Sequence, residues 1–256
     1  MIAHKLAPKS VAKRKLSVAA NSPEPISQRA RAYQGFTQQI LSGGILPGQF
    51  ISQRELMTLL DMPLAAVREM IPRLEAGGLI KTVPQRGLQI ATVDLKLIRN
   101  AFQVRSMIER EAVLNFVRTA SDAELDEIEA SHRDILARAS VLDHVQLIKD
   151  TRLLDDAQAL DWGLHDRMVD ALGNEIISEI YRVNSLRVRL IRLEGSTLSA
   201  QVLIPAMEEH LWFIDALKRR DAQAVLQRLS HHIESAQLRV LGLPRPDIPW
   251  SMENPE

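Results

Sequence analysis

The sequence predicts a mainly α protein in two parts: a small N-terminal part of short helices closed by a two-stranded hairpin, and an all-helical bundle after it. Three observations predict this. Residues 28–92 are divided by glycine and proline clusters that mark turns. Residues 93–242 hold few glycines and prolines and repeat apolar residues at helical spacing. With 256 residues, the chain is long enough for two ordinary domains.

The composition is that of a soluble globular protein, with 46% hydrophobic and 25% charged residues. The chain contains no cysteine, which excludes disulfides, thiolate metal sites and cysteine nucleophiles. The basic start is followed by an apolar stretch, 16–20, that is too short for a secretory signal. Since the sequence also lacks a run of about 18 apolar residues, we expect a cytoplasmic protein with no membrane partner.

The formal net charge of zero conceals an asymmetry. Residues 1–92 hold 12 Lys and Arg against 5 Asp and Glu, whereas residues 93–256 hold 20 against 27. A basic front and an acidic back favour nucleic-acid binding by the N-terminal part alone. An accidental split around a basic tail would give the same totals, so this argument needs support from the motifs.

The N-terminal part begins with a basic segment, 1–27, that shows no sustained period and is expected to be a disordered arm. Ser52 and Glu55 stand three residues apart in a capping-box pattern, which predicts the start of a helix. The turn over 84–87 lies between two short apolar runs, which predicts a hairpin. The expected elements are helices over about 28–42, 52–60 and 64–76 and strands over about 79–82 and 88–91.

Two short helices, a turn and a hairpin make a winged helix-turn-helix, which can place a helix in the major groove of DNA. Residues 33–91 resemble this domain in the GntR family of bacterial transcription regulators. The motifs that carry the resemblance are Gly-Ile-Leu-Pro-Gly at 44–48, Ser-Gln-Arg-Glu-Leu at 52–56, Arg-Leu-Glu-Ala-Gly-Gly-Leu-Ile at 73–80 and Pro-Gln-Arg-Gly at 84–87.

The resemblance implies that the third helix enters the major groove and that the hairpin tip approaches the minor groove. Arginine binds guanine or phosphate in a bidentate way, and glycine lets backbone approach a groove closely. Surface ion pairs with neighbouring glutamates are the alternative role for Arg54 and Arg68. The residues implied at the DNA are Arg54, Leu64, Ala65, Arg68, Arg86 and Gly87.

Three residues depart from the family pattern or from helical preference. Pro63 and Leu64 stand where a small hydroxyl residue and an arginine are usual. The change removes hydrogen-bond donors and leaves apolar groups that can touch a thymine methyl. Pro72 lies inside the third helix and is expected to kink it or to shorten its regular part.

The C-terminal part is predicted to be helical almost to its end. A long apolar stripe begins at Leu97 and continues to Ala112, and Ser121 with Glu124 repeats the capping-box pattern. We expect an all-helical domain over 93–242. The later helices are expected over about 142–154, 156–172, 175–193, 199–220 and 222–241, with an extended tail over 243–256.

Four polar residues fall on the apolar faces of these helices. Asp161 and His165 are four residues apart and share one helix face. His210 and His232 stand eleven residues before and after the turn at Asp221, so an antiparallel helix pair brings both imidazoles to the same height. His231 would face elsewhere and be exposed. Three histidines and a carboxylate that converge suit zinc, nickel or manganese, although each histidine alone would be an ordinary core residue.

Residues 95–241 resemble the FCD-type effector domain of the FadR subfamily, an all-helical bundle in which an Asp-x-x-x-His pair and two later histidines bind a metal. The resemblance implies a metal site at Asp161, His165, His210 and His232. It also implies a small organic acid effector whose carboxylate meets the metal, with a second anchor from Arg105, Arg187 or Arg189. Leu164 replaces the usual phenylalanine before the first histidine.

These features indicate a ligand-responsive transcription regulator that binds a palindromic DNA operator as a homodimer. The alternative is a metalloenzyme with an accessory DNA-binding module, since the same ligand set can hold a catalytic metal. Against an enzyme, the sequence has no His-Glu-x-x-His motif, no nucleophile elbow and no phosphate loop.

Overall fold

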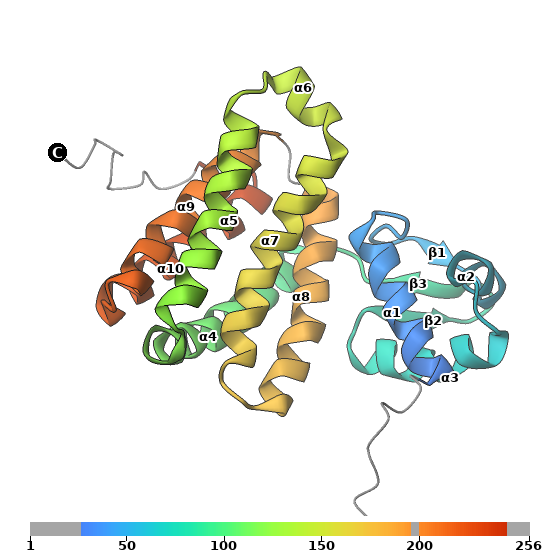
Figure 1. Ribbon diagram of the computed structural model, residues 1–256. Helices are drawn as coiled ribbons and strands as arrows, with labels where there is room; N and C mark the ends of the chain where they lie inside the picture. Colours follow the sequence, from blue (N-terminus) through green and yellow to red (C-terminus); the bar gives the residue numbers. More distant parts are fainter. Residues whose placement is uncertain (1–26, 196–199, 245–256) are drawn as a thin grey trace, which may run out of the picture.

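The computed structural model describes residues 27–195 and 200–244 of the chain. It confirms a mainly α protein in which a small winged domain is followed by a helical bundle (Figure 1). The predicted basic arm and most of the predicted extended tail lie outside the described residues. Within the described ranges, no helix is long and apolar enough to cross a membrane.

The winged domain holds three helices and a three-stranded antiparallel sheet with the strand order β1-β3-β2. Phe50 pairs with Gln89, and Gln89 pairs with Lys81 on its other side. The sequence did not predict β1, because two residues are too few to show a period. The elements are α1 (Gln28–Leu41), β1 (Phe50–Ile51), α2 (Gln53–Leu60), α3 (Leu64–Ala76), β2 (Ile80–Val83) and β3 (Gly87–Ile90).

Local chemistry explains how α2 and α3 begin and end. The hydroxyl of Ser52 accepts a hydrogen bond from the Glu55 amide at 3.1 Å, and the Glu55 carboxylate accepts from the Ser52 amide at 2.7 Å, which confirms the predicted capping box. Of the two effects expected from Pro72, the shortening of the third helix does not occur, since α3 continues to Ala76. Pro72 is exposed and removes only its own backbone donor, whereas the buried face of α3 still packs on the core.

The bundle is formed by seven helices of the described chain, which wrap a core of aliphatic and aromatic residues. The break expected near residue 155 lies at Asp150, whose carboxylate accepts from the Leu153 amide at 3.0 Å and caps α7. The helices are α4 (Leu95–Thr119), α5 (Asp122–Ser140), α6 (His144–Lys149), α7 (Thr151–Asp170), α8 (Glu175–Gly195), α9 (Ala200–Lys218) and α10 (Ala222–Val240).

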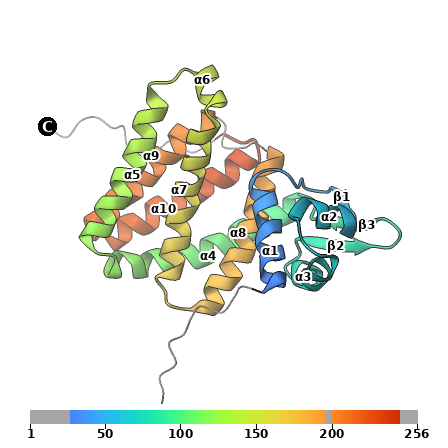
Figure 2. The same ribbon diagram turned by 45° about the vertical axis from the view of Figure 1, so that its right-hand side comes forward.

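Helix α8 joins the two domains, because it packs on the bundle with one face and on α1 with another (Figures 1 and 2). Leu186 and Leu190 of α8 are buried in the apolar core of the winged domain. Arg187 donates from Nη2 to the carbonyl of Gly77 at 2.5 Å, and Gly77 caps the C-terminus of α3. The end of the predicted recognition helix is therefore held by a helix of the bundle.

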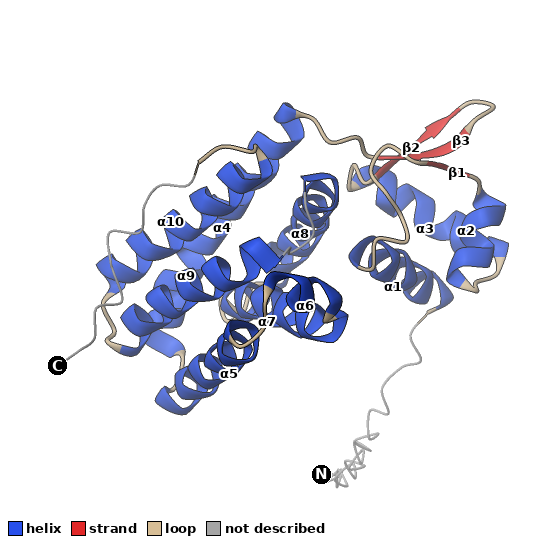
Figure 3. Cartoon of the chain, turned by 90° about the horizontal axis from the view of Figure 1, so that it is seen from above, coloured by secondary structure: helices blue, strands red, loops and turns tan. Residues whose placement is uncertain are grey.

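The β2–β3 turn projects from the winged domain on the side away from the bundle (Figure 3). Gly87 begins β3 with φ at +92°, a backbone conformation that L side chains rarely adopt. A Cβ atom at this position would lie 3.1 Å from the carbonyl oxygen of Ile51. The close approach of β1 and β3 therefore requires glycine here.

We expect Gly87→Ala to lower the free energy of unfolding by about 1–3 kcal/mol. The backbone of alanine is strained at this positive φ, and its Cβ atom would crowd the Ile51 carbonyl oxygen. Urea unfolding measures the change. Gly163→Ala is the matched control: this glycine lies within α7, and a Cβ there meets nothing within 4 Å. The control should keep or gain up to about 1 kcal/mol. Equal free energies of unfolding in the two variants would contradict the conclusion that the approach of β1 to β3 requires glycine at position 87.

Candidate functional site

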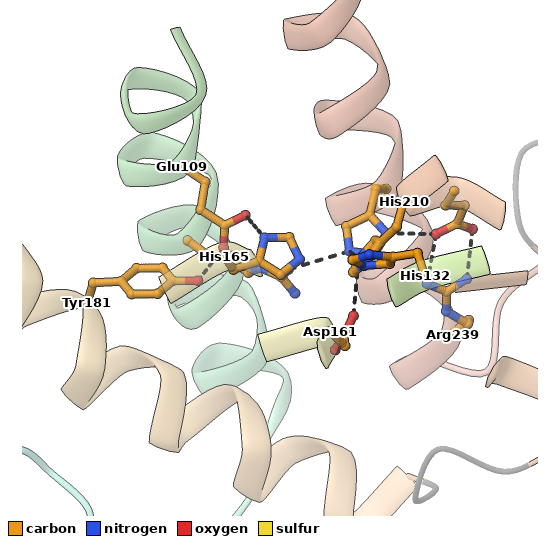
Figure 4. Close-up of polar contacts among 10 residues, drawn as sticks. Glu109, His132, Asp161, His165, Tyr181, His210 and Arg239 are labelled. Carbon is orange, nitrogen blue, oxygen red and sulfur yellow. Dashed lines mark hydrogen bonds and ion pairs between the residues drawn. The ribbon is translucent and has the colours of Figure 1, made fainter. Parts of the chain in front are cut away.

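The structure brings Asp161, His165, His210 and His232 together within the bundle, and Figure 4 shows the first three of them. Asp161 and His165 come from α7, His210 from α9 and His232 from α10. All four side chains are buried, and one candidate ligand atom of each lies within 4.8 Å of the others. Asp221 caps the start of α10. His210 and His232, eleven residues before and after it, come together as the sequence predicts.

His165 is held by two residues of α4, one of which also contacts α8. Its Nδ1 lies 2.8 Å from Oε2 of Glu109, and Nη2 of Arg105 lies 2.9 Å from its Nε2. The other carboxylate oxygen of Glu109 accepts from Arg105 Nε at 2.7 Å and from the Tyr181 hydroxyl at 2.6 Å. Glu109 thus faces the Nδ1 side of the ring, which leaves Nε2 directed toward the cluster.

His232 is held by a carboxylate in the same way. Its Nδ1 lies 2.9 Å from Oε2 of Glu209, and Arg239 donates to both oxygens of Glu209 at 2.8 and 3.0 Å. Because an ionised carboxylate only accepts hydrogen bonds, the proton of neutral His232 belongs on Nδ1. Its Nε2 then carries a lone pair, and this atom lies 3.3 Å from Nε2 of His210.

His210 is held by another histidine. Nδ1 of His210 lies 3.0 Å from Nε2 of His132, and Nδ1 of His132 lies 2.7 Å from the carbonyl oxygen of Ile128. On its other side, Nε2 of His210 lies 3.1 Å from Oδ1 of Asp161. Each of the three histidines therefore has an outer partner at Nδ1 and directs Nε2 inward.

Burial favours the neutral forms of His210, His232 and His132. Desolvation lowers the pKa of His210 and, together with repulsion from His210 and His165, lowers that of His232 well below the usual value. Desolvation and the neighbouring His210 lower the pKa of His132 to about 3. Burial would raise the pKa of Glu109, but the attraction of Arg105 and His165 outweighs it and lowers that pKa to about 2.

The donor set fits a divalent cation. Three imidazoles and a carboxylate oxygen converge within a buried space, and they are the ligands that zinc and similar metals prefer. The nearest positive charge in this space is the guanidinium of Arg105, whose Nη2 lies 2.9 Å from Nε2 of His165. The cluster could thus hold a metal, and a bound ion would supply positive charge that attracts an anionic ligand.

The three arginines considered as effector anchors lie in different places. Arg105 is buried beside His165 and lies 3.5 Å from Nε2 of His232. Arg187 instead binds the Gly77 carbonyl at the domain interface. Arg189 stacks 4.5 Å from the ring centre of Trp162 and lines a cavity of about 360 Å³ beside α1 and α7. Its role as an anchor stays a prediction.

Three neighbours of the cluster were not singled out from the sequence as polar partners: His132, Glu209 and Tyr181. His132 lies on an apolar stripe of α5, where a lone histidine looks like an ordinary core residue. Helical spacing predicts that His132 points into the core, but it does not predict that His210 is its partner. His231 is half-buried rather than exposed, since it packs edge-on against Trp212 with a ring separation of 5.4 Å.

A cavity of about 200 Å³ between α5 and α7 approaches the cluster from outside. His132 lines it on the α5 side, and Gly163 lines it on the α7 side. No side chain occupies the space beside Gly163, because a Cβ there would meet nothing within 4 Å. The cavity therefore reaches the histidine that holds His210.

The residues considered for DNA contact lie on the surface of the winged domain. Arg54 at the start of α2 and Ala65 and Arg68 in α3 are exposed, and Leu64 is half-buried. Arg68 donates from Nε to the Gln53 side chain at 3.1 Å, which ties the beginning of α2 to α3.

Two of the glutamates offered as alternative partners for these arginines are engaged elsewhere. Glu55 caps α2 through its bond to the Ser52 amide. Glu75 accepts from the Thr82 amide at 2.9 Å, which connects α3 to β2. The hairpin itself presents an exposed Arg86, whose guanidinium lies 3.8 Å from the ring centre of Phe50 in β1.

Comparison with known proteins agrees with both halves of the structure. Residues 28–90 match the model of bacterial regulatory proteins of the gntR family, and residues 100–235 match the FCD domain. The HTH-type transcriptional repressor RspR of Escherichia coli K12 is 22% identical over 91% of this chain and 96% of its own. The uncharacterized HTH-type transcriptional regulator BphR of Paraburkholderia xenovorans LB400 is 26% identical over 90% of this chain and 94% of its own.

Two solved structures share the fold. Escherichia coli McbR/YncC aligns with a TM-score of 0.68 and 16% identity over 85% of this chain and 99% of its own. A putative GntR transcriptional regulator from Rhodococcus sp. RHA1 aligns with a TM-score of 0.68 and 19% identity over the same shares.

A winged domain that can enter a DNA groove, joined to a helical bundle, is the architecture of a DNA-binding transcription regulator. The chain belongs to the GntR family and carries an FCD domain in its C-terminal part.

Proposed function

We propose that this protein is a ligand-responsive transcription regulator whose bundle binds a divalent metal and, through it, a small organic acid. The observation that carries the proposal is the buried convergence of Asp161 with three histidines, because one candidate ligand atom of each lies within 4.8 Å of the others. Zinc, nickel and manganese all accept this donor set. The metalloenzyme alternative has no observation in its favour within the described residues.

Arg105 supports the choice of an anionic effector. Its guanidinium lies 2.9 Å from Nε2 of His165 and is buried with Glu109 as its ion-pair partner. Burial would lower the pKa of Arg105, but the charge of Glu109 raises it, so the group stays a cation. A metal and an arginine side by side provide two positive groups, and a carboxylate can bind both.

The contacts of α8 supply a route from this centre to the DNA-binding surface. His165 contacts Glu109, Glu109 accepts from Tyr181 of α8, and six residues further along the same helix Arg187 binds the Gly77 carbonyl. A ligand that binds one placement of α8 better than another would shift the position of α3. We infer that the effector changes operator affinity through this helix.

On DNA, we propose that Arg54, Leu64, Ala65 and Arg68 face the major groove and that Arg86 and Gly87 approach the minor groove. The exposure of the arginines and the projection of the hairpin support this assignment. A homodimer on a palindromic operator would let two winged domains read two half-sites related by the same two-fold axis. Such a regulator would act in the cytoplasm.

We expect the metal-replete protein to carry one divalent ion per chain. His210→Ala and His232→Ala should each abolish stoichiometric metal in elemental analysis, because each removes one of the four ligands. Returning metal to chelator-treated wild type should raise the free energy of unfolding, by about 2.7 kcal/mol at a free concentration one hundred times the Kd.

His231→Ala is the control for this prediction, since His231 lies one residue from a proposed ligand but packs against Trp212. It should keep its metal. If metal-replete wild type carries none, the four residues are core polar groups and the proposed sensor mechanism fails.

We expect Arg68→Ala to weaken binding to an operator selected from random DNA by about 1–3 kcal/mol, the contribution of a good bidentate contact. Fluorescence anisotropy measures the affinity, and circular dichroism checks the fold. Arg118→Ala removes the same charge from an exposed position in the last turn of α4 and should leave affinity unchanged. Wild-type affinity in Arg68→Ala would remove this residue from the DNA contact.

We expect Arg187→Ala to reduce the ratio of operator affinities between metal-loaded and chelator-treated protein, because the variant releases the end of α3 from α8. Arg182→Ala is the control: this arginine also lies on α8 but binds Asp170 of α7 at 2.9 Å. The control should keep the wild-type ratio. An unchanged ratio in Arg187→Ala, or a ratio of one in wild type, would contradict coupling of the metal through α8.

A further inference from the structure

His132 is a buried histidine beside the cluster that is not one of its four candidate ligands. It lies on α5, between the cavity that opens between α5 and α7 and the ring of His210. Its two nitrogens both have partners: the Ile128 carbonyl lies on one side, and His210 lies on the other, as Figure 4 shows. These two contacts determine what His132 can do.

The protonation of His132 follows from its first partner. A backbone carbonyl only accepts hydrogen bonds, and the Ile128 oxygen lies 2.7 Å from Nδ1 of His132. The proton of the neutral ring therefore belongs on Nδ1, and Nε2 carries a lone pair. That lone pair is directed at Nδ1 of His210, 3.0 Å away.

The protonation of His210 follows in turn. With a cation bound at the cluster, Nδ1 of His210 would donate to His132, because the opposite tautomer sets two lone pairs against each other at 3.0 Å and leaves Nε2 without an electron pair for the metal. Nε2 of His210 then presents its lone pair beside Oδ1 of Asp161, at 3.1 Å. In the opposite tautomer, His210 would donate from Nε2 to Asp161, and that hydrogen bond would occupy two of the atoms that a metal needs.

We propose that His132 is a positioning residue for the metal centre. By accepting a hydrogen bond from Nδ1 of His210, it keeps Nε2 of His210 unprotonated and so raises the metal affinity of the cluster. This inference rests on the proposed metal site. Outer partners that orient a ligating histidine typically contribute 10–100-fold to metal affinity.

The partner of His210 differs in kind from those of the other two histidines. His165 and His232 face the carboxylates of Glu109 and Glu209, and an ionised carboxylate offers only acceptor atoms. A neutral imidazole accepts at one nitrogen only, so His132 depends on the Ile128 carbonyl to keep that nitrogen free of a proton. The two successive contacts, from the Ile128 carbonyl to His132 and from His132 to His210, therefore depend on each other.

Two substitutions distinguish the role of His132 as a hydrogen-bond acceptor from its role in filling space. His132→Phe keeps an aromatic ring but removes the acceptor, whereas His132→Gln keeps an accepting oxygen near the position of Nε2. Zinc affinity is measured by competition with a chromophoric chelator, and cobalt loading is followed by its visible absorption band. We expect His132→Phe to bind zinc about 10–100-fold more weakly than wild type, with an altered cobalt band. His132→Gln should stay within a few-fold of wild type.

His231→Phe is the control for introducing a phenylalanine next to the ligands, and it should bind zinc like wild type. Thermal unfolding of each chelator-treated variant reports the fold without metal, and His132→Leu replaces His132→Phe if that variant does not fold. Wild-type affinity in His132→Phe would overturn the inference while leaving the metal site in place. An equal loss in His132→Phe and His132→Gln would also overturn it, since the acceptor would then not matter. Absence of zinc binding by wild type would instead overturn the metal site itself.

Discussion

The arrangement of the bundle depends on one constraint, the convergence of three imidazole rings and one carboxylate in its core. Each ring has a partner on the far nitrogen: Glu109 for His165, Glu209 for His232 and His132 for His210. Those partners come from α4, α9 and α5, while the ligands come from α7, α9 and α10. Buried polar groups without partners are costly, so the helices must keep these separations for the core to be stable.

The same constraint links folding to ligand binding. Charges that lie among buried donors interact strongly, because water is excluded and screening is weak. Arg105 and Glu109 form a buried ion pair in contact with His165. Since Glu109 also accepts a hydrogen bond from Tyr181, a change in charge at the four-residue cluster acts on the contact between α4 and α8. A cation bound at the centre therefore acts on a network that already extends to α8 rather than on four isolated side chains.

The sequence predicted what depends on spacing along one helix or across one turn. Four-residue spacing placed Asp161 and His165 on one face, and the equal arms around Asp221 brought His210 and His232 together. The outer partners depend on packing between helices far apart in the chain, such as α5 against α9, which no local period reveals. For the same reason Arg187 could be assigned to an effector, although its position at the Gly77 carbonyl is an interface contact.

Helix α8 connects two kinds of interaction that respond differently to displacement. Leu186 and Leu190 pack into the winged domain through apolar contacts that tolerate small shifts, whereas the Arg187 bond to Gly77 needs its geometry to within a few tenths of an ångström. A small rotation of α8 would therefore break the bond at the end of α3 before it separates the domains. Under the proposed mechanism the winged domain would stay attached with and without ligand, and the change would lie in how firmly the C-terminus of α3 is held.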